Sequence, residues 1–217
     1  MTLAVRLQNA LRDLHTRIEQ LPLAQAMANG TIGREEYGRL LAQLRYVHRA
    51  LEAVLPERKE LESIYQPSMA RASDLLTDLA ALGLLGAAQR VLPQTRAFAE
   101  EISGPWSRSP ASLLGCLYVL EGSRMGSMVL APRLAKALGV AMLPGQGLDY
   151  HIRELERRPM LWRQFKTALE ALPFAHDQAD LLVDAAQRTM AHLYAIYEAA
   201  ADGKATDRSP RRGEVLV

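Results

Sequence analysis

Residues 111–138 read ASLLGCLYVLEGSRMGSMVLAPRLAKAL, a long and mostly apolar run that ends at Gly139. The apolar character predicts a buried helix, but the middle of the run does not suit a regular one. Gly122 and Gly126 each cost a helix interior about 1 kcal/mol relative to alanine, and Pro132 lacks a backbone donor. We therefore expect a helix that bends near its middle.

The rest of the chain also reads as helices. Apolar residues recur every three or four positions in segments that Pro and Gly separate, and no alternating run is long enough to predict a strand. Asn29-Gly30 suits a left-handed helix end, Thr31 is a candidate N-cap, and Ser109-Pro110 suits a helix start. The expected helices are a first helix to Gln20, then Pro22 to Asn29, Thr31 toward Pro56, Ser68 to Leu82, Pro93 to Ile102, Ala111 to Leu138, Met160 to Ala171 and Asp177 to Ala201.

Composition is typical of a globular protein with one substantial core. The chain has 217 residues, of which 49% are hydrophobic and 23% charged, and we expect a single all-α domain over residues 1–201. Its 26 basic and 24 acidic residues are mixed along the chain, too evenly for a nucleic-acid surface. Residues 202–217 contain Arg208, Arg211 and Arg212 beside Pro210 and Gly213, and we expect this tail to be disordered.

Cys116 is the only cysteine, so the chain cannot form an intrachain disulfide. Neither end carries a secretory leader pattern or an apolar run of 18 residues. These features predict a cytoplasmic protein without a membrane span.

His15 is the candidate metal ligand of the first helix. Leu7, Leu11 and Ile18 mark an apolar face, on which we expect His15 to point inward. A histidine that binds iron through one ring nitrogen needs an acceptor for its other N–H, and Glu19 at i+4 lies on the same face. The alternative is a core histidine that donates to a backbone carbonyl.

Gly122 and Gly126 lie four residues apart and so share one face of their helix. They would leave a strip where the backbone can be approached closely, for example by a flat ligand. The alternative is a tight crossing of two helices that need small residues between them.

Two stretches resemble the haem oxygenases, in particular their bacterial branch, which includes members that supply bilin to bacteriophytochromes. Residues 11–19, LRDLHTRIE, are similar to the family's proximal helix, and residues 117–126, LYVLEGSRMG, are similar to its kinked distal helix. A weaker similarity covers Leu161-Trp162-Arg163, on a helix where the family places an arginine near a haem propionate. The order of helices agrees with the family over about residues 1–201.

The resemblance implies a helical bundle of the haem oxygenase type that cleaves haem to biliverdin, carbon monoxide and iron. Haem would be both substrate and cofactor, O2 the oxidant, and an external reductase or ferredoxin the electron donor; a bilin-accepting protein is a further implied partner. We expect a monomer. The implied site residues are His15 as iron ligand, Glu19 as its acceptor, Gly122 and Gly126 over the haem, Ser123 beside ordered water, and Tyr118 and Arg163 as further haem contacts.

Several assignments at this site stay open. Many family members have an aspartate where this chain has Ser123, so the groups that hold distal water are undetermined. Arg124 and Met125 do not suit a water network, and Arg124 facing solvent is the alternative. Arg12 and Arg17 are equally well explained as surface residues, as is Tyr118 by packing. Cys116 as a thiolate ligand is disfavoured because its surroundings are apolar.

Two other functions are compatible with a helical bundle. A haem carrier without turnover needs only the iron ligand and a pocket that binds haem. Thiamin-related hydrolysis or a di-iron site uses a similar bundle, but no histidine follows a glutamate by three residues, and no His-Glu-x-x-His, Cys-x-x-Cys or Gly-x-Ser-x-Gly motif occurs.

Overall fold

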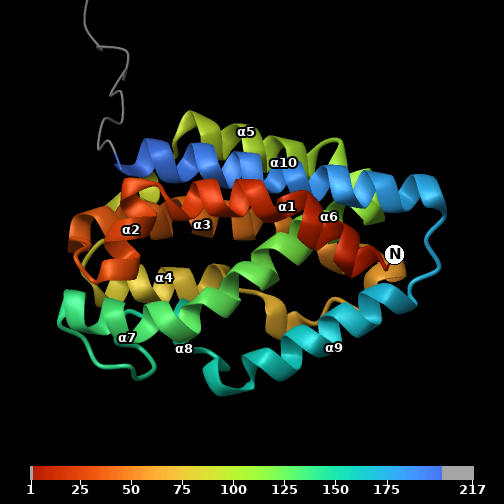
Figure 1. Cartoon of the computed structure of the whole chain (residues 1–217). Coiled ribbons are helices and arrows are strands. Elements are labelled where there is room, and N and C mark those ends of the chain that lie inside the picture. Colours follow the sequence, from red (N-terminus) through yellow and green to blue (C-terminus); the bar gives the residue numbers. More distant parts are fainter. Residues whose placement is uncertain (1, 202–217) are drawn as a thin grey trace, which may run out of the picture.

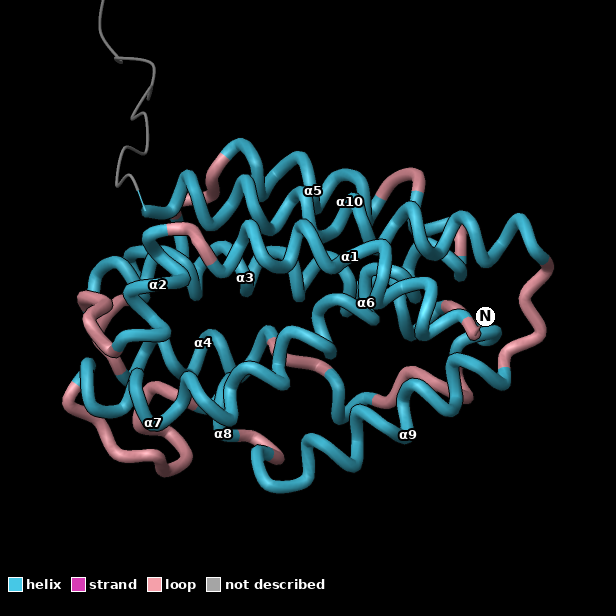
Figure 2. The backbone as a smooth tube through the Cα atoms, viewed as in Figure 1, coloured by secondary structure: helices cyan, strands magenta, loops and turns pink. Residues whose placement is uncertain are grey.

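The computed structural model describes residues 2–201, and of Ala88 and Gln89 it describes only the backbone. Within residues 2–201 the chain forms helices and turns and no strand, which confirms the all-α prediction (Figures 1 and 2). The α-helices are α1 (Leu3–Glu19), α2 (Pro22–Asn29), α3 (Arg34–Val54), α4 (Ala72–Ala81), α5 (Pro93–Ser103), α6 (Pro110–Ser123), α7 (Ser127–Leu138), α8 (Asp149–Ile152), α9 (Arg158–Ala171) and α10 (His176–Ala201). Short 3-10 turns are η1 (Leu55–Glu57), η2 (Lys59–Leu61), η3 (Pro67–Met69), η4 (Leu85–Gln89), η5 (Trp106–Arg108), η6 (Arg124–Gly126) and η7 (Leu155–Arg157).

The most extensive contact between two helices is the one between α6 and α10. Ten consecutive residues of α6, from Ala111 to Leu120, are buried. At Gly115 the two backbones come so close that an added Cβ would lie 2.9 Å from the backbone nitrogen of Ala186 and 3.0 Å from Cβ of Ala185. A tight helix crossing therefore exists, and it is Gly115 that permits it.

Most helix ends agree with the sequence patterns. Gly30 ends α2 with a φ of 67°, and Ser109 accepts a hydrogen bond from the N–H of Ser112 at the start of α6, as expected. Thr31 is not an N-cap, because its hydroxyl donates back to the carbonyl of Ala26 (3.4 Å) and α3 begins three residues later, after Gly33.

The fourth predicted helix also begins later than expected, at Ala72 instead of Ser68. The carboxylate of Glu52 accepts from the backbone N–H groups of Arg71 (2.6 Å) and Ala72 (3.0 Å), and so satisfies the start of α4 from another helix. The sequence could not show this contact, because Glu52 lies about twenty residues earlier.

The bend predicted within residues 111–138 is present. The helix is interrupted by the 3-10 turn η6, which includes Gly126, and continues as α7 with Pro132 inside it until Gly139, whose φ is 65°. By length and hydropathy alone, Pro110–Leu138 would also qualify as a membrane span. However, 56% of the window that qualifies is buried inside the protein, as for a core helix.

The disordered tail predicted for residues 202–217, including Arg208, Arg211 and Arg212, lies outside the described residues.

Candidate functional site

His15 lies on the side of α1 that is turned away from α10. Arg6 bonds to Asp180 of α10 (2.5 Å), and the guanidinium of Arg17 lies 4.8 Å from the ring centre of Tyr194, also on α10. Two residues correspond to about 200° around a helix, so His15 points away from that contact. Its side chain is 62% exposed, so the expectation of an inward-pointing His15 was wrong. The core-histidine alternative fails for the same reason.

Glu19 lies beside His15, as expected. Nδ1 of His15 is 3.5 Å from Oε1 of Glu19, whose side chain is 63% exposed. The pairing places an acceptor on the Nδ1 side of the ring and leaves Nε2 on the opposite edge of the imidazole. This is the arrangement that a histidine needs in order to bind a metal through Nε2.

The other four histidines are less suited to bind a ligand. His48 and His151 are buried, and burial lowers the pKa of each to about 3. His192 is engaged through Nε2 with Glu101 (2.7 Å) and stacks on a phenylalanine ring. His176 is 87% exposed in the first turn of α10. Of the five histidines, His15 is therefore the one whose ring is accessible and whose free Nε2 suits it best to bind a ligand.

The bent helix presents an open and partly apolar face. Gly126, Val129, Leu130 and Arg133 are spaced so that they share one side of η6 and α7. The guanidinium of Arg133 donates to the carbonyl of Ala28 in α2, so this side is turned toward the α1–α2 segment. A Cβ added at Gly126 would meet only the end of Leu130 at 3.8 Å, and Val129 is 53% exposed.

Gly122 does not share this open surface. A Cβ added there would lie 3.2 Å from Cη2 and 3.4 Å from Cζ2 of Trp162 on α9. The expectation of one open strip at both glycines was therefore wrong at Gly122, because α9 sends an aromatic ring across it.

The two ends of the α1–α2 segment are held by α9, which packs against the bent helix at Gly122, and by α7, which is the second half of the bent helix. Glu170 of α9 accepts from the backbone N–H groups of Leu3 (3.2 Å) and Ala4 (2.6 Å), and Arg133 of α7 bonds to α2. In Figure 1, α1 passes in front of α6, while α2 meets α7 at the other end. His15 and the open face at Gly126 therefore belong to two walls that are joined at their ends.

The two further predicted haem contacts, Arg163 and Tyr118, have different surroundings. Arg163 is exposed on α9 and forms no ion pair with any described residue, so its guanidinium is available to an anion. Tyr118 is buried and its ring centre lies 5.0 Å from that of Trp162, an arrangement that agrees with packing. Arg12 bonds to Asn9 on its own helix (2.8 Å).

Ser123 is exposed at the end of α6. Its hydroxyl donates to the carbonyl of Leu120 (2.8 Å), so its proton is used within the helix while its oxygen can still accept. Cys116 is fully buried, and burial raises the pKa of its thiol to about 12. A thiolate ligand at Cys116 is therefore disfavoured, as expected.

Sequence reasoning missed a charged cluster beneath the bend. Arg71, Arg124 and Arg158 are buried, with 0%, 3% and 3% exposure. Nη1 of Arg124 lies 2.9 Å from Glu121, and Nη2 of Arg71 lies 3.3 Å from Glu154. A solvent-facing Arg124 is thus excluded. For Arg124 the local signal was Glu121 at i−3, because its other partners, Arg153, Glu154 and Arg158, lie about thirty residues away. Asp74 at i+3 was a similar signal for Arg71.

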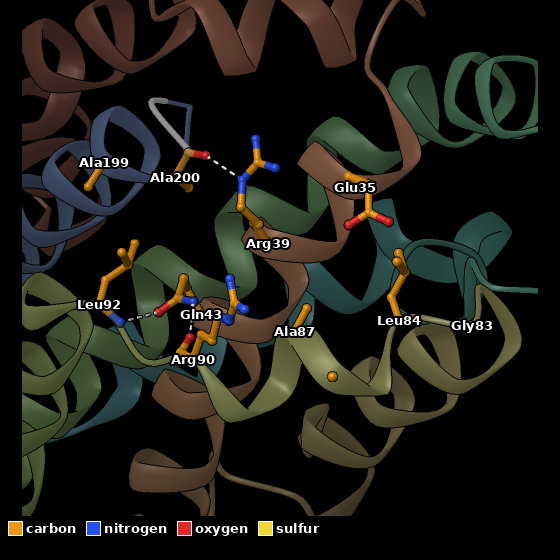
Figure 3. A pocket seen from close by; sticks show the side chains of 11 residues that line it. Glu35, Arg39, Gln43, Gly83, Leu84, Ala87, Arg90, Leu92, Ala199 and Ala200 are labelled. Atoms are coloured by element: carbon orange, nitrogen blue, oxygen red, sulfur yellow. Dashed lines mark hydrogen bonds between the residues drawn. The ribbon is translucent and has the colours of Figure 1, made fainter. Parts of the chain in front are cut away.

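Two cavities in the described part of the chain lie elsewhere. One of about 410 Å³ is formed by α3, the η4 region and the end of α10, where Gln43 bonds to Arg90 and Leu92 (Figure 3). The other, of about 490 Å³, lies beside Glu52 and Tyr65. Neither is lined by His15, Gly126 or Arg163.

Known proteins give a consistent result. A family model described as Heme oxygenase matches residues 1–199. The chain is 34% identical over 80 residues to Heme oxygenase 2 of Synechocystis sp. PCC 6803 and 37% identical over 92 residues to Heme oxygenase of Xanthomonas campestris pv. campestris. These matches cover 36% and 42% of this chain but only 32% and 52% of the two relatives.

The fold agrees with a solved structure, that of heme oxygenase-1 from Synechocystis sp. PCC 6803 in complex with heme. The TM-score is 0.82 with 20% identity, and the match covers 92% of each chain. At this level of identity the comparison shows that the two proteins share a fold.

Proposed function

Because the chain belongs to the haem oxygenase family, we propose that it cleaves haem to biliverdin, carbon monoxide and iron. The observation that carries this proposal is the exposed His15–Glu19 pair on α1, set in a frame whose other wall is the open face of η6 and α7. Haem supplies the iron at which oxygen is activated, and the protein must bind, orient and shield it.

His15 is the proposed proximal ligand. Its Nε2 binds iron in the neutral ring form, while Glu19 holds the Nδ1 proton and fixes the ring orientation. As a ligand, the imidazole of His15 would donate less electron density to the iron than a thiolate would, which would favour oxidation of the macrocycle over cleavage of an O–O bond. The high pKa of the Cys116 thiol agrees with this choice of ligand.

The other wall limits the space above the haem. The bare backbone at Gly126 lets the macrocycle approach closely, and Ser123 accepts a hydrogen bond from distal water. Gly122 has an indirect role, since it admits the ring of Trp162 that supports the bend.

Arg163 is the proposed partner of a haem propionate, because it is exposed and without an ion-pair partner among the described residues. Tyr118 packs against Trp162, so its proposed role at the haem site is indirect, through support of that ring.

We also propose that O2 and electrons from an external reductase or ferredoxin support turnover, and that a bilin-accepting protein takes the product. The chain is proposed to act in the cytoplasm as a monomer, with residues 1–201 as one domain.

The experiment that tests the function is a single-turnover assay of the haem-loaded protein under oxygen, with ascorbate or with ferredoxin and its reductase. Biliverdin formation is expected, with release of carbon monoxide. A haem complex that gives no bilin absorption after exhaustive exposure would contradict the proposal and favour the alternative, a haem carrier without turnover.

A further inference from the structure

The carbonyl of Arg124, inside the bend, accepts two hydrogen bonds. One comes from the backbone N–H of Ser127, which makes the turn 3-10 instead of α. The other comes from Nη1 of Arg158 at 2.7 Å, from the first residue of α9. A carbonyl that is bonded from the side by a cation is drawn away from the helix axis, and such an inserted partner is an established cause of helix kinks.

A second set of bonds closes a ring around this contact. Nη2 of Arg158 donates to the carbonyl of Arg153 at 2.7 Å, and Nη2 of Arg124 donates to the same carbonyl at 3.3 Å. The side chain of Arg124 is held in turn by Glu121 at 2.9 Å. We call Arg124, Arg158 and the Arg153 carbonyl the arginine clamp.

Arg158 is an unusual residue at its position. It is 3% exposed, and within the described residues its guanidinium bonds to carbonyls and forms no ion pair with a carboxylate. A cation in the first turn of a helix also opposes the helix dipole. Burial of the Arg158 cation without a carboxylate partner is unfavourable for α9 itself. The interaction that offsets this cost is the hydrogen bond to the Arg124 carbonyl in the bend.

The second contact of α9 with the bent helix comes from the same face of α9. Trp162 follows Arg158 by four residues, and its ring lies against Gly122 just before the bend. Arg158 and Trp162 therefore support the bend from two points, one on each side of Ser123.

We propose that Arg158 is a positioning residue that fixes the bend through the Arg124 carbonyl, and thereby sets how the backbone at Gly126 lies over the haem. The consequence of this positioning is the choice of the meso carbon at which haem is cleaved, and that part of the inference rests on the proposed function. The clamp itself exists in the haem-free protein and is tested there.

The test compares Arg158→Ala and Arg158→Lys with Arg157→Ala, which removes an exposed arginine one residue earlier. Amide hydrogen exchange of the haem-free proteins is measured at residues 125–129 and, as an internal reference, in the middle of α10. Arg158→Ala is expected to accelerate exchange at the bend about tenfold or more, since hydrogen bonds from charged donors are the strong ones. Arg158→Lys retains the cation but satisfies one carbonyl at a time, so an intermediate effect is expected.

The haem-loaded proteins are then compared by the C–O stretching frequency of their carbon monoxide complexes and by the ratio of biliverdin isomers. We expect both to change in the Arg158 variants and to stay as in the wild type for Arg157→Ala. If Arg158→Ala does not fold, Arg158→Lys carries the test.

Unchanged exchange at residues 125–129 in a folded Arg158 variant would overturn the clamp. Faster exchange with an unchanged C–O frequency and isomer ratio would overturn its positioning role. Failure of the proposed function is distinguishable, because a wild type that forms no bilin still shows whether the clamp holds the bend.

Discussion

The indole ring of Trp162 covers Gly122, with Cη2 only 3.2 Å from the position that a Cβ at Gly122 would occupy. At Gly126, one turn further along the bent helix, the corresponding position has a neighbour only at 3.8 Å. A glycine is therefore required at Gly122 and at Gly126 for different physical reasons. One admits a side chain of the protein, and the other leaves a surface open.

Substitution of each glycine by alanine is expected to have different effects on stability. Gly126→Ala should leave the free energy of unfolding of the haem-free protein unchanged or raise it by up to about 1 kcal/mol, because alanine favours a helix. Gly122→Ala should be about 1–3 kcal/mol less stable than Gly126→Ala, because the same helix preference is offset there by the shift that the ring of Trp162 must make. Denaturant unfolding of the haem-free variants measures both.

Haem titration gives the complementary result. Gly126→Ala is expected to weaken haem binding at least tenfold, since its methyl group projects from the open face, and the fully folded haem-free variant serves as its own control. Equal haem affinities for Gly126→Ala and wild type would show that the macrocycle does not approach this backbone.

Glu19→Gln is expected to weaken haem binding or turnover by about 10- to 100-fold, the usual effect of losing a partner that orients a metal-binding histidine. The iron–histidine stretching frequency of the ferrous protein should fall. An amide accepts a weaker hydrogen bond from the Nδ1–H than a carboxylate does, so the imidazole donates less electron density to the iron. Asp13→Asn, an exposed carboxylate on the same helix, is the control. An unaltered frequency in Glu19→Gln would contradict the role of Glu19.

Arg163→Ala tests the propionate contact through a double comparison. The variant is expected to bind haem several-fold more weakly than wild type, yet to bind haem dimethyl ester with nearly wild-type affinity, because the ester has no carboxylates to pair. Gln164→Ala, also exposed on α9, should behave as wild type with both ligands. An equal loss with haem and with its ester would show that Arg163 acts through packing.

Stability below neutral pH should depend on His151. Burial lowers its pKa to about 3, so the folded state keeps the ring neutral while the unfolded state takes up a proton below about pH 6.5. Its contribution to stability is complete above pH 6.5 and decreases as the pH falls. Between pH 7 and 5 this amounts to about 2 kcal/mol.

Between pH 7 and pH 5, we expect the free energy of unfolding of His151→Asn to fall by about 2 kcal/mol less than that of the wild type. Asp78 acts in the opposite direction, because burial raises its pKa to about 7, but it is common to both proteins and cancels. His176→Gln, which removes a histidine that is 87% exposed, should follow the wild type. Parallel pH profiles of wild type and His151→Asn would contradict this account.

The fold could be predicted from the sequence because its main signals are local. The period of the apolar residues defines α1 and α10, and the glycines near residue 124 predict the bend. The exposure of His15 was missed because it lies at the edge of the apolar face, where only the position of α10 decides between core and surface. The clamp was missed for a related reason: Arg124 and Arg158 are 34 residues apart, and no local pattern connects a side chain of one with the carbonyl of the other.

The assignment of His15 as the haem ligand is the claim on which the functional account depends. Its most direct test is the electronic spectrum of haem-loaded His15→Ala, with and without added imidazole. We predict that the variant loses the histidine-ligated spectrum and nearly all bilin formation, while its haem-free fold is retained because the side chain is exposed, and that imidazole restores the spectrum. An unchanged spectrum in His15→Ala without imidazole would contradict the assignment.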